Sequence, residues 1–549
     1  MPTIAQHYIP HHPLRIQPQG LRPLIFLAAF SAASLMFASA ASAQIGPSAA
    51  PQTATPAVQL PLSGRSAETG GTVKATETPI AGVTTSVNTI NSTVQATGNY
   101  SGSTPSTKLM PFNGKLGFQE AILRALSYNL GQTGATQAVR QAEGQAKSVR
   151  ANLLPNLTGT AMENVETEDL RALGFRFNFP GFNFPQVIGP FNYVDFRAHL
   201  SQTVLDVTSL NNYRASNDVT RANRYSAMDA RDLIVLAVGG AYLQVTAAKA
   251  RLAAEQAQVA AADAVYQQSV QQLARGIIAK VDADKNQVQL LTEQTRLLSL
   301  QNDYAKQKIN LARMVGLPPT DQYEVIDEIP FAPAMPLTVS DAVTQALAQR
   351  ADLKAADAQL QAAMRAKAAA RAERYPSISV NADVGGIGVT PGQLQTTYTA
   401  TANMKIPIWQ GGRVSGDVEQ ADATLAQRRA ECADLKSQIE GDVRSAFLDL
   451  QAAASQVEVA QRNVQVTREA AELTRQKLEA GVSTTVDYTQ AQETATAAQL
   501  DYINAVFAHN IAKLSLARAM GRAAKSLPDF LQLPPAPVSA PQLAPTHAQ

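Results

Sequence analysis

The sequence is poor in cysteine, in aromatic residues and in charge of one sign, and each shortage excludes a class of protein. Cys432 is the only cysteine among 549 residues, so the chain has no disulfide framework and no thiolate metal cluster. Aromatic residues make up only 6%, which disfavours a large globular core and favours long helices packed on small side chains. The 46 basic and 44 acidic residues are interspersed, so no basic stripe is available to bind nucleic acid.

Motifs for catalysis and metal binding are also missing. The sequence contains no phosphate loop, no nucleophile elbow and no paired-carboxylate pocket, so we expect neither an enzyme nor a cofactor. The six histidines are scattered, which argues against a zinc site. Asp282 to Glu293 has the acidic and amide spacing of a calcium loop, but Gln287 stands where that loop needs glycine. Leu290 and Leu291 continue a helical pattern there, so we interpret the segment as helix.

The N-terminus, residues 1–43, has the pattern of a secretory signal peptide. Arg15 and Arg22 precede an apolar run, and residues 41–43 (Ala-Ser-Ala) match the small-x-small pattern that signal peptidase cleaves. A single-pass membrane anchor is the alternative, although about 15 apolar residues are short for a bilayer span. No later stretch approaches the length of an apolar spanning helix. If the exported chain crosses a membrane, it must therefore do so as a closed β-barrel.

Two segments are rich in Ser, Thr, Pro and Ala and lack periodic apolar positions. These are residues 44–114 and the tail 526–549, and we expect both to be disordered. Between them lie two similar units, 115–320 and 336–525, which are joined by a linker, 321–335.

The two units share matched positions in the same order, which indicates an internal duplication. The matched pairs are Leu116 with Leu337 and Pro155 with Pro376 at an offset of 221, and Gly276 with Gly481 and Asp282 with Asp487 at an offset of 205. The offset changes because the first unit carries an insertion, RALGFRFNFPGFNFPQVIGPF (171–191). Its phenylalanines either pack the loop and anchor it at a lipid interface or rim the exit of a channel.

Each unit also predicts two β-strands that follow a helix. Apolar and polar residues alternate with period two along 193–201, 377–384 and 397–404, and more weakly after Pro155. Pro155 and Pro376 therefore mark helix-to-strand junctions. Four strands cannot close around water alone, whereas three chains would supply 12 strands. The alternative is a soluble sheet with one face on a core.

The remaining segments predict long helices that are interrupted once in each unit. From Leu236 to Ala264, small and apolar residues recur in steps of four and three, the spacing of a coiled-coil seam. The interruptions are RGIIAKVD (275–282) and AGVSTTVD (480–487). In each, a glycine can adopt the positive φ of a helix end, and Ser, Thr or Asp can cap the next helix. We expect each interruption to be the tip of an antiparallel helical hairpin.

This combination resembles the TolC family of outer-membrane efflux proteins. The resemblance covers about residues 115–525 and is carried by the opening LTVSDAVTQALAQRADLKAADAQLQAA, by the junction prolines and by the Gly-x4-Val-Asp tips. The tip residues are Gly276, Val281, Asp282, Gly481, Val486 and Asp487. The resemblance implies a mixed α+β fold, mostly α, with four strands per chain. It also implies a homotrimer that forms a 12-stranded transmembrane β-barrel in the outer membrane and an α-helical barrel in the periplasm.

The resemblance further implies a passive exit duct for a tripartite efflux or type I secretion system. The tips would dock on a periplasmic adaptor protein joined to an inner-membrane pump, and Asp282 and Asp487 would narrow the pore, cap the helices, or do both. Ser483 and Gln490 depart from the family pattern, which has an arginine and an aspartate there. The alternative function is an exported, non-conducting coiled-coil spacer of the cell envelope.

Overall fold

The computed structural model describes residues 71–81, 88–104, 112–174, 185–320, 322–327, 331–333 and 337–524. The expected signal peptide, the tail and most phenylalanines of the 171–191 insertion lie outside these residues.

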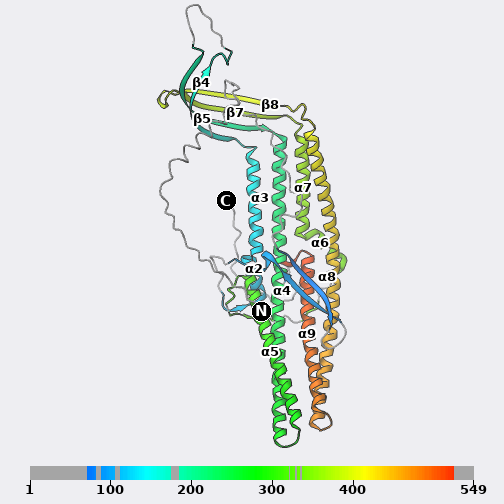
Figure 1. Ribbon diagram of the computed structural model, residues 1–549. Helices are drawn as coiled ribbons and strands as arrows, with labels where there is room; N and C mark the ends of the chain where they lie inside the picture. Colours follow the sequence, from blue (N-terminus) through cyan, green and yellow to red (C-terminus); the bar gives the residue numbers. More distant parts are fainter. Residues whose placement is uncertain are drawn as a thin grey trace, which may run out of the picture. The chain divides into compact units, whose positions relative to one another are not determined.

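The described elements run twice through the same order: two helices, two strands and two long helices (Figure 1). The first copy contains α2 (Phe118–Tyr128), α3 (Leu130–Ala151), β4 (Asn156–Asp169), β5 (Val187–Leu205), α4 (Val207–Ala274) and α5 (Lys280–Val315). The second contains α6 (Val339–Gln349), α7 (Ala351–Ala372), β7 (Ser377–Gly388), η2 (Pro391–Gln393), β8 (Gln395–Lys405), α8 (Arg413–Glu479) and α9 (Thr485–Ala519). The long helices have 68 and 36 residues in the first copy and 67 and 35 in the second.

The chain divides into two compact units, which we describe separately. Of the described residues, the strand unit takes those within Gly159–Ala198 and Asp383–Thr399. The helical unit takes those within Thr55–Thr158, His199–Ala382 and Ala400–Gln549. Four strands form one sheet in the order β4-β5-β7-β8, which confirms the two strands expected from each copy. β4 and β8 are the two edges of this sheet.

Local chemistry fixes where the long helices begin and end. The Asp206 carboxylate precedes α4 and accepts hydrogen bonds from the backbone N–H groups of Thr208 and Ser209 at 2.9 and 3.1 Å. At the other end of the hairpin, α5 ends at Gly316, whose φ of 79° lies in the left-handed region that favours glycine. The caps define the boundaries, and packing between helices supplies the stability.

Shorter helices cover α4 one after the other. On α3, the Ala142 carbonyl accepts a hydrogen bond from the Thr220 hydroxyl at 3.2 Å, in the first part of α4. On α5, Asn286 donates to the Ser269 hydroxyl at 2.5 Å, near the end of α4. α4 also packs against α7 and α9, and α8 packs against α7 and α9. The 68 residues of α4 thus contact both copies.

Part of the predicted linker is folded. β1 (Val73–Ala81) and β2 (Asn88–Ala96) form an antiparallel pair and are followed by the short helix η1 (Gly98–Ser101). The prediction that residues 44–114 are disordered is therefore wrong for this part.

The reason is close packing against α4 and α3. A Cβ atom on Gly240 of α4 would lie 2.5 Å from a Val94 methyl, so the missing side chain makes room for β2. Tyr100 is buried, and its ring lies where a side chain on Gly131 of α3 would be. The sequence did not indicate this, because the complementary surface is supplied by glycines far along the chain.

The linker between the copies also takes part in the fold. β6 (Glu324–Val325) pairs in parallel with β3 (Lys115–Leu116), the segment that precedes α2. Leu116 and Val325 belong to the main hydrophobic cluster, which also contains residues from α2, α4, α5 and α9. The beginning and the end of the first copy are therefore joined in one core.

One sequence expectation about membrane spans is wrong. α4 contains an 18-residue window with a mean hydropathy of 1.5, long and apolar enough by composition to cross a bilayer. However, 67% of that window is buried within the structure. A helix that is apolar on most sides also suits a protein core, and here α2, α9 and the β1–β2 pair cover α4.

Candidate functional site: the paired helix tips

The two interruptions predicted from the sequence adopt the same backbone conformation. Gly276 and Gly481 each have φ of 73°, and a side chain at either position would meet open space. The backbone N–H groups of Ile277 and Val482 both donate back to the helix that has just ended, at 2.9 Å. Each glycine thus ends one long helix and lets the chain reverse into the next.

The second tip is closed by a reciprocal capping box. The Thr484 hydroxyl accepts from the Asp487 N–H at 3.2 Å, and the Asp487 carboxylate accepts from the Thr484 N–H at 3.0 Å. The hydroxyls of Ser483 and Thr484 also donate to this carboxylate, at 3.1 and 2.8 Å. The Thr484 N–H, followed by these hydroxyls, lowers the pKa of Asp487, so the side chain stays charged.

The first tip lacks such a box. Ala279 is the N-cap of α5 and offers no side-chain acceptor. Asp282 lies in the first turn, 3.7 Å from the Lys285 ammonium and half exposed. The segment from Asp282 to Glu293 is entirely helical, so it does not form a calcium-binding loop. The two tips therefore have the same backbone but different side-chain bonding.

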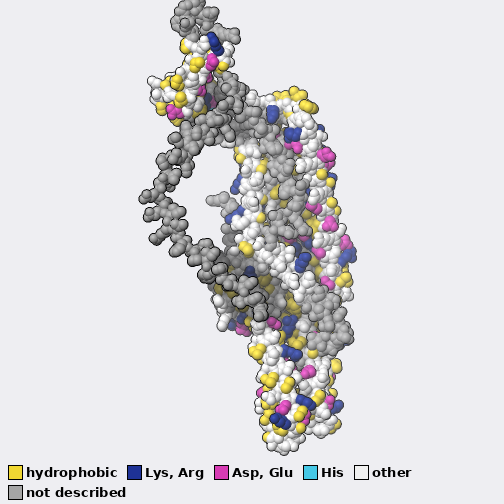
Figure 2. Space-filling view, viewed as in Figure 1, with side chains coloured by type: hydrophobic (Ala, Val, Ile, Leu, Met, Phe, Trp, Pro, Cys, Tyr) yellow, Lys and Arg dark blue, Asp and Glu magenta, His cyan; other side chains and the backbone are white. Residues whose placement is uncertain are grey.

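The tips of the two copies lie side by side in the helical unit (Figure 1). A cavity of about 230 Å³ lies between the first turns of α5 and α9. It is lined by Asp282, Lys285, Asn286 and Gln289 from α5 and by Val486, Thr489, Gln490 and Glu493 from α9. Val281 and Val486 are exposed, and Figure 2 shows hydrophobic and charged side chains intermixed around this end of the helices.

The junction prolines stand directly before strands in both copies. Pro155 follows the turn after α3 and precedes β4, and Pro376 follows the turn after α7 and precedes β7. Proline has no N–H to continue a helix and restricts the residue before it to extended conformations. Pro155 and Pro376 are thus placed where the backbone changes from helix to strand.

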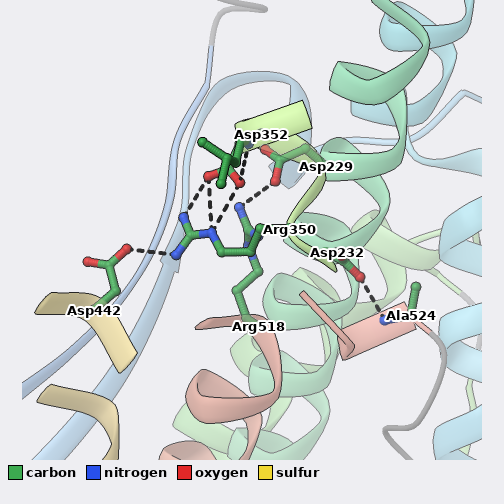
Figure 3. Close-up of polar contacts among 8 residues, drawn as sticks. Asp229, Asp232, Arg350, Asp352, Asp442, Arg518 and Ala524 are labelled. Carbon is green, nitrogen blue, oxygen red and sulfur yellow. Dashed lines mark hydrogen bonds and ion pairs between the residues drawn. The ribbon is translucent and has the colours of Figure 1, made fainter. Parts of the chain in front are cut away.

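Sequence reasoning missed a polar cluster that joins the two copies (Figure 3). We call it the Arg350 cluster; it consists of Asp229, Asp232, Arg350, Asp352, Asp442, Arg518 and Ala524. Arg350, between α6 and α7, is 6% exposed and bonds Asp352 at 2.6 Å and Asp442 of α8 at 3.0 Å. Arg518 of α9 pairs with Asp229 of α4 at 2.6 Å.

The sequence contains only a weak indication of the Arg350 cluster. Arg350 and Asp352 belong to the RADL stretch of the second copy, but Asp442 lies 92 positions away and the Arg518–Asp229 pair spans 289 positions of the chain. At the matching position of the first copy, Asn129 caps α3 instead, accepting from the Gly131 N–H at 2.8 Å. The duplicated fold therefore uses different bonds at its two helix junctions.

No metal centre accompanies these groups in the described part of the chain. Among those residues, no three His, Cys, Asp or Glu side chains lie close enough together to hold a metal ion.

These features define a class of protein: two copies of a long helical hairpin, each joined to a pair of strands in a shared sheet. The chain belongs to the outer membrane efflux protein family, whose sequence profile matches residues 125–317 and 342–522. The matched segments fall within the two copies, and the chain is accordingly an outer-membrane protein.

Solved structures show the same fold. The CmeC outer membrane channel of Campylobacter jejuni superimposes with a TM-score of 0.65 at 17% identity, covering 76% of this chain and 89% of that one. VceC of Vibrio cholerae gives a TM-score of 0.63 at 19% identity, covering 74% and 96%. The first of these is an outer membrane channel and the second an outer membrane protein.

Relatives of similar sequence carry outer-membrane names. Outer membrane protein OprJ of Pseudomonas aeruginosa is 25% identical over 408 residues, which is 70% of this chain and 79% of that protein. Outer membrane efflux protein BepC of Brucella suis is 25% identical over 191 residues, which is 34% of this chain. The match spans less than half of BepC, 42% of its length.

Because only the second tip has a capping box, we predict different effects of replacing the two tip aspartates. We expect Asp487→Ala to speed amide hydrogen exchange in the first turn of α9 by roughly five-fold, the size of effect expected when a helix loses its cap. Asp282→Ala is the matched control, because Asp282 makes no capping bond, and it should leave exchange at the start of α5 nearly unchanged. Equal effects in the two variants would contradict the structural difference between the tips.

Proposed function

We propose that this protein is the outer-membrane exit duct of a tripartite efflux or type I secretion system. Three copies would form one passive channel, closed or opened at the periplasmic helix tips. A periplasmic adaptor protein would dock there and link the channel to an inner-membrane pump, which would supply the energy. Family membership supports this proposal. The strongest support comes from the exposed apolar side chains of the sheet.

The supporting observation is that the strand unit leaves apolar side chains bare. Val165, Phe196, Val384 and Tyr398 are 70%, 43%, 55% and 82% exposed. None of them joins the hydrophobic clusters found among the described residues. A soluble sheet would cover such side chains with a core, whereas lipid covers them on a barrel.

The polar side of β5 and β7 carries a shielded group of ion pairs. Arg197 of β5 is flanked by Asp195, at 2.8 Å, and by Asp383 of β7, at 2.6 Å. Asp195 is only 8% exposed, although its neighbour Phe196 is exposed. Polar groups paired along one face and bare apolar groups on the other suit a barrel with a wet interior.

Two further features support a ring of identical chains. The sheet has four strands with edges at β4 and β8, and unpaired edges are not tolerated in lipid. The helices α5 and α8 also carry exposed apolar side chains at spacings of seven and three residues, as interfaces between helices do. These are Val281, Val288, Leu291 and Leu298 on α5 and Val459, Val466 and Leu473 on α8. A ring of three chains would pair the edges and contain 12 strands.

The tips are the proposed gate of this duct. Gly276 and Gly481 allow the reversals, and Val281, Asp282, Val486 and Asp487 lie at the ends of the hairpins. With Ser483 bound to Asp487 and Gln490 lining the cavity between the tips, a closing network built on arginine has no counterpart at these positions. We therefore propose that the aspartates themselves narrow the opening.

Electrical recording tests both the duct and the gate. We expect the purified protein to conduct ions across planar lipid bilayers, and Asp282→Ala with Asp487→Ala to raise the single-channel current several-fold. Asp434→Ala is the matched control, because Asp434 is exposed on α8 far from the tip in sequence. Currents equal to the parent's in the tip variant would reject gating by these aspartates. A complete lack of current in every variant would favour the spacer.

A further inference from the structure

Two buried carboxyl groups face each other inside the first helical hairpin. Glu255 of α4 is 0% exposed and Glu293 of α5 is 2% exposed. Neither carboxyl oxygen of Glu255 has a hydrogen-bond donor. The group that lies against it is the Glu293 carboxyl. Two ionised carboxylates cannot hydrogen-bond each other, so this contact becomes favourable only when one of them holds a proton.

The seam of small residues expected from the sequence runs along a different side of α4. It runs through Ala254 and Ala257, which line a cavity shared with α8 and α9, whereas the buried residue that meets α5 is Glu255. The sequence pattern shows which residues share one side of α4, but not which neighbouring helix that side meets. The spacing of small residues along α4 therefore did not predict the buried pair of Glu255 and Glu293.

The second hairpin provides an internal comparison. The residues 205 positions after Glu255 and Glu293 are Ala460 and Ala498, which are buried at 8% and 0% exposure. The fold thus accepts two small apolar side chains at this place. Buried carboxyl groups are costly, so the first hairpin carries a polar pair that hairpin packing does not require.

The surroundings provide little compensation for two negative charges. From α5, Gln289 donates to one Glu293 oxygen at 2.7 Å and the half-exposed Arg296 to the other at 3.2 Å. On α4, the Arg251 guanidinium donates a hydrogen bond to the Asn504 side chain of α9 at 2.7 Å.

Among the residues that the structure describes, the hydrogen bonds to Glu293 come from α5 and none reaches the Glu255 carboxyl. Nearby α9 residues are the uncharged Gln492 and Thr496, which donate to Gln258 of α4. Three charged residues of α8 line a cavity of about 570 Å³ next to α4 and α9. They are Arg468, Glu472 and Arg475. Arg468 bonds Gln499, and Arg475 pairs with Glu472, so these charges have partners of their own.

We propose that Glu255 and Glu293 form a proton-binding site that controls how tightly α4 packs on α5. With one proton bound, the Glu255 hydroxyl donates to the Glu293 carboxylate and the helices stay together. Without it, two negative charges meet in a dry interface, and the part of the hairpin that leads to the tip loosens. The first hairpin would then respond to pH, and the second would not.

The direction of the pH dependence follows from the pKa. Burial, and then the neighbouring Glu293, raises the pKa of Glu255 from its ordinary 4.5 to about 7. Between these values the folded protein holds a proton that the unfolded chain has released. The pair therefore loses its stabilising bond as the pH rises through about 7, and acid tightens the hairpin.

Distance measurements between spin labels test the proposal on the full chain. Nitroxides would be attached at Gln268→Cys on α4 and Gln287→Cys on α5, both exposed positions, with Cys432→Ala removing the native thiol. We expect a narrow distance distribution at about pH 5.5 and a broader, longer one at about pH 8.5.

Two variants make the result decisive. Glu255→Ala with Glu293→Ala copies the second hairpin and should give a narrow distribution at both pH values. Glu255→Gln keeps a donor toward Glu293 without a titrating proton and should do the same. An unchanged distribution in the parent protein, or a pH response that persists in either variant, would overturn the proposal. The readout is helix separation, so it is independent of whether the protein conducts.

Discussion

Replacing Arg350 with alanine is expected to lower the free energy of unfolding by about 3–5 kcal/mol, the range for breaking a buried ion pair from one side. Arg350 is almost fully buried and binds Asp352 with two nitrogens and Asp442 with a third contact (Figure 3). Without the guanidinium, the Asp352 carboxylate loses its ion-pair partner at 2.6 Å. Denaturant unfolding of the detergent-solubilised protein would measure the loss.

The pH dependence of this loss identifies its cause. Burial alone would raise the pKa of Asp352, but the hydrogen bonds and charge of Arg350 outweigh burial and hold the pKa below its ordinary 3.8. The pairing therefore stabilises the fold above pH 3.8 and is lost as the pH falls through the folded-state pKa. We expect the difference between the parent and Arg350→Ala to shrink in acid.

Arg444→Ala is the control for Arg350→Ala. Arg444 pairs with Glu440 one turn away on α8, but both side chains are exposed, at 60% and 48%. Its loss should change stability by no more than about 0.5 kcal/mol. If the two arginine variants were equally stable, the bonds of Arg350 to Asp352 and Asp442 would not stabilise the second copy.

Replacing Gly521 with alanine is expected to cost about 2–5 kcal/mol, from two sources that the structure separates. Gly521 has φ of 69°, and a side chain in the left-handed region costs roughly 1–2 kcal/mol. In addition, its new Cβ atom would lie 2.9 Å from the Cα atom of Arg350 and 3.0 Å from its backbone nitrogen. Backbone atoms cannot rotate away, so overpacking adds about 1–3 kcal/mol.

Gly481→Ala isolates the first source. Gly481 has nearly the same φ, 73°, but open space around the position of the new atom. We expect this tip variant to lose only the backbone contribution, about 1–2 kcal/mol or less if the tip frays locally. Equal losses at the two glycines in urea unfolding would show that the contact with Arg350 contributes nothing.

The repeated organisation could be predicted from the sequence because it rests on local chemistry. Gly276 and Gly481 end helices through their own conformational freedom, and Thr484 and Asp487 cap the next helix through groups three residues apart. Alternation along 377–384 likewise encodes a strand, β7, without reference to any other segment.

The errors occur where distant residues meet. The strands β1 and β2 were assigned to a disordered linker because the surface that orders them, including Gly240, lies far along the chain. The seam through Ala257 was predicted without its partner helices, because the α8 and α9 residues that share a cavity with it lie far along the chain. The Arg350 cluster was missed because its partners come from four separate segments.

The sequence by itself determined the helices, the strands, the two tips and the prolines between helix and strand. These depend on the propensities, caps and periodicity of residues that are close in the chain. Only the tertiary structure decided which carboxyl groups are buried without hydrogen-bond partners and which glycines have a distant residue packed against them. It also decided that the two tips lie beside one another. Those outcomes depend on the register and rotation with which long helices pack, because Glu255 and Ala257 lie about 200° apart around α4 and only one of them can be buried against α5.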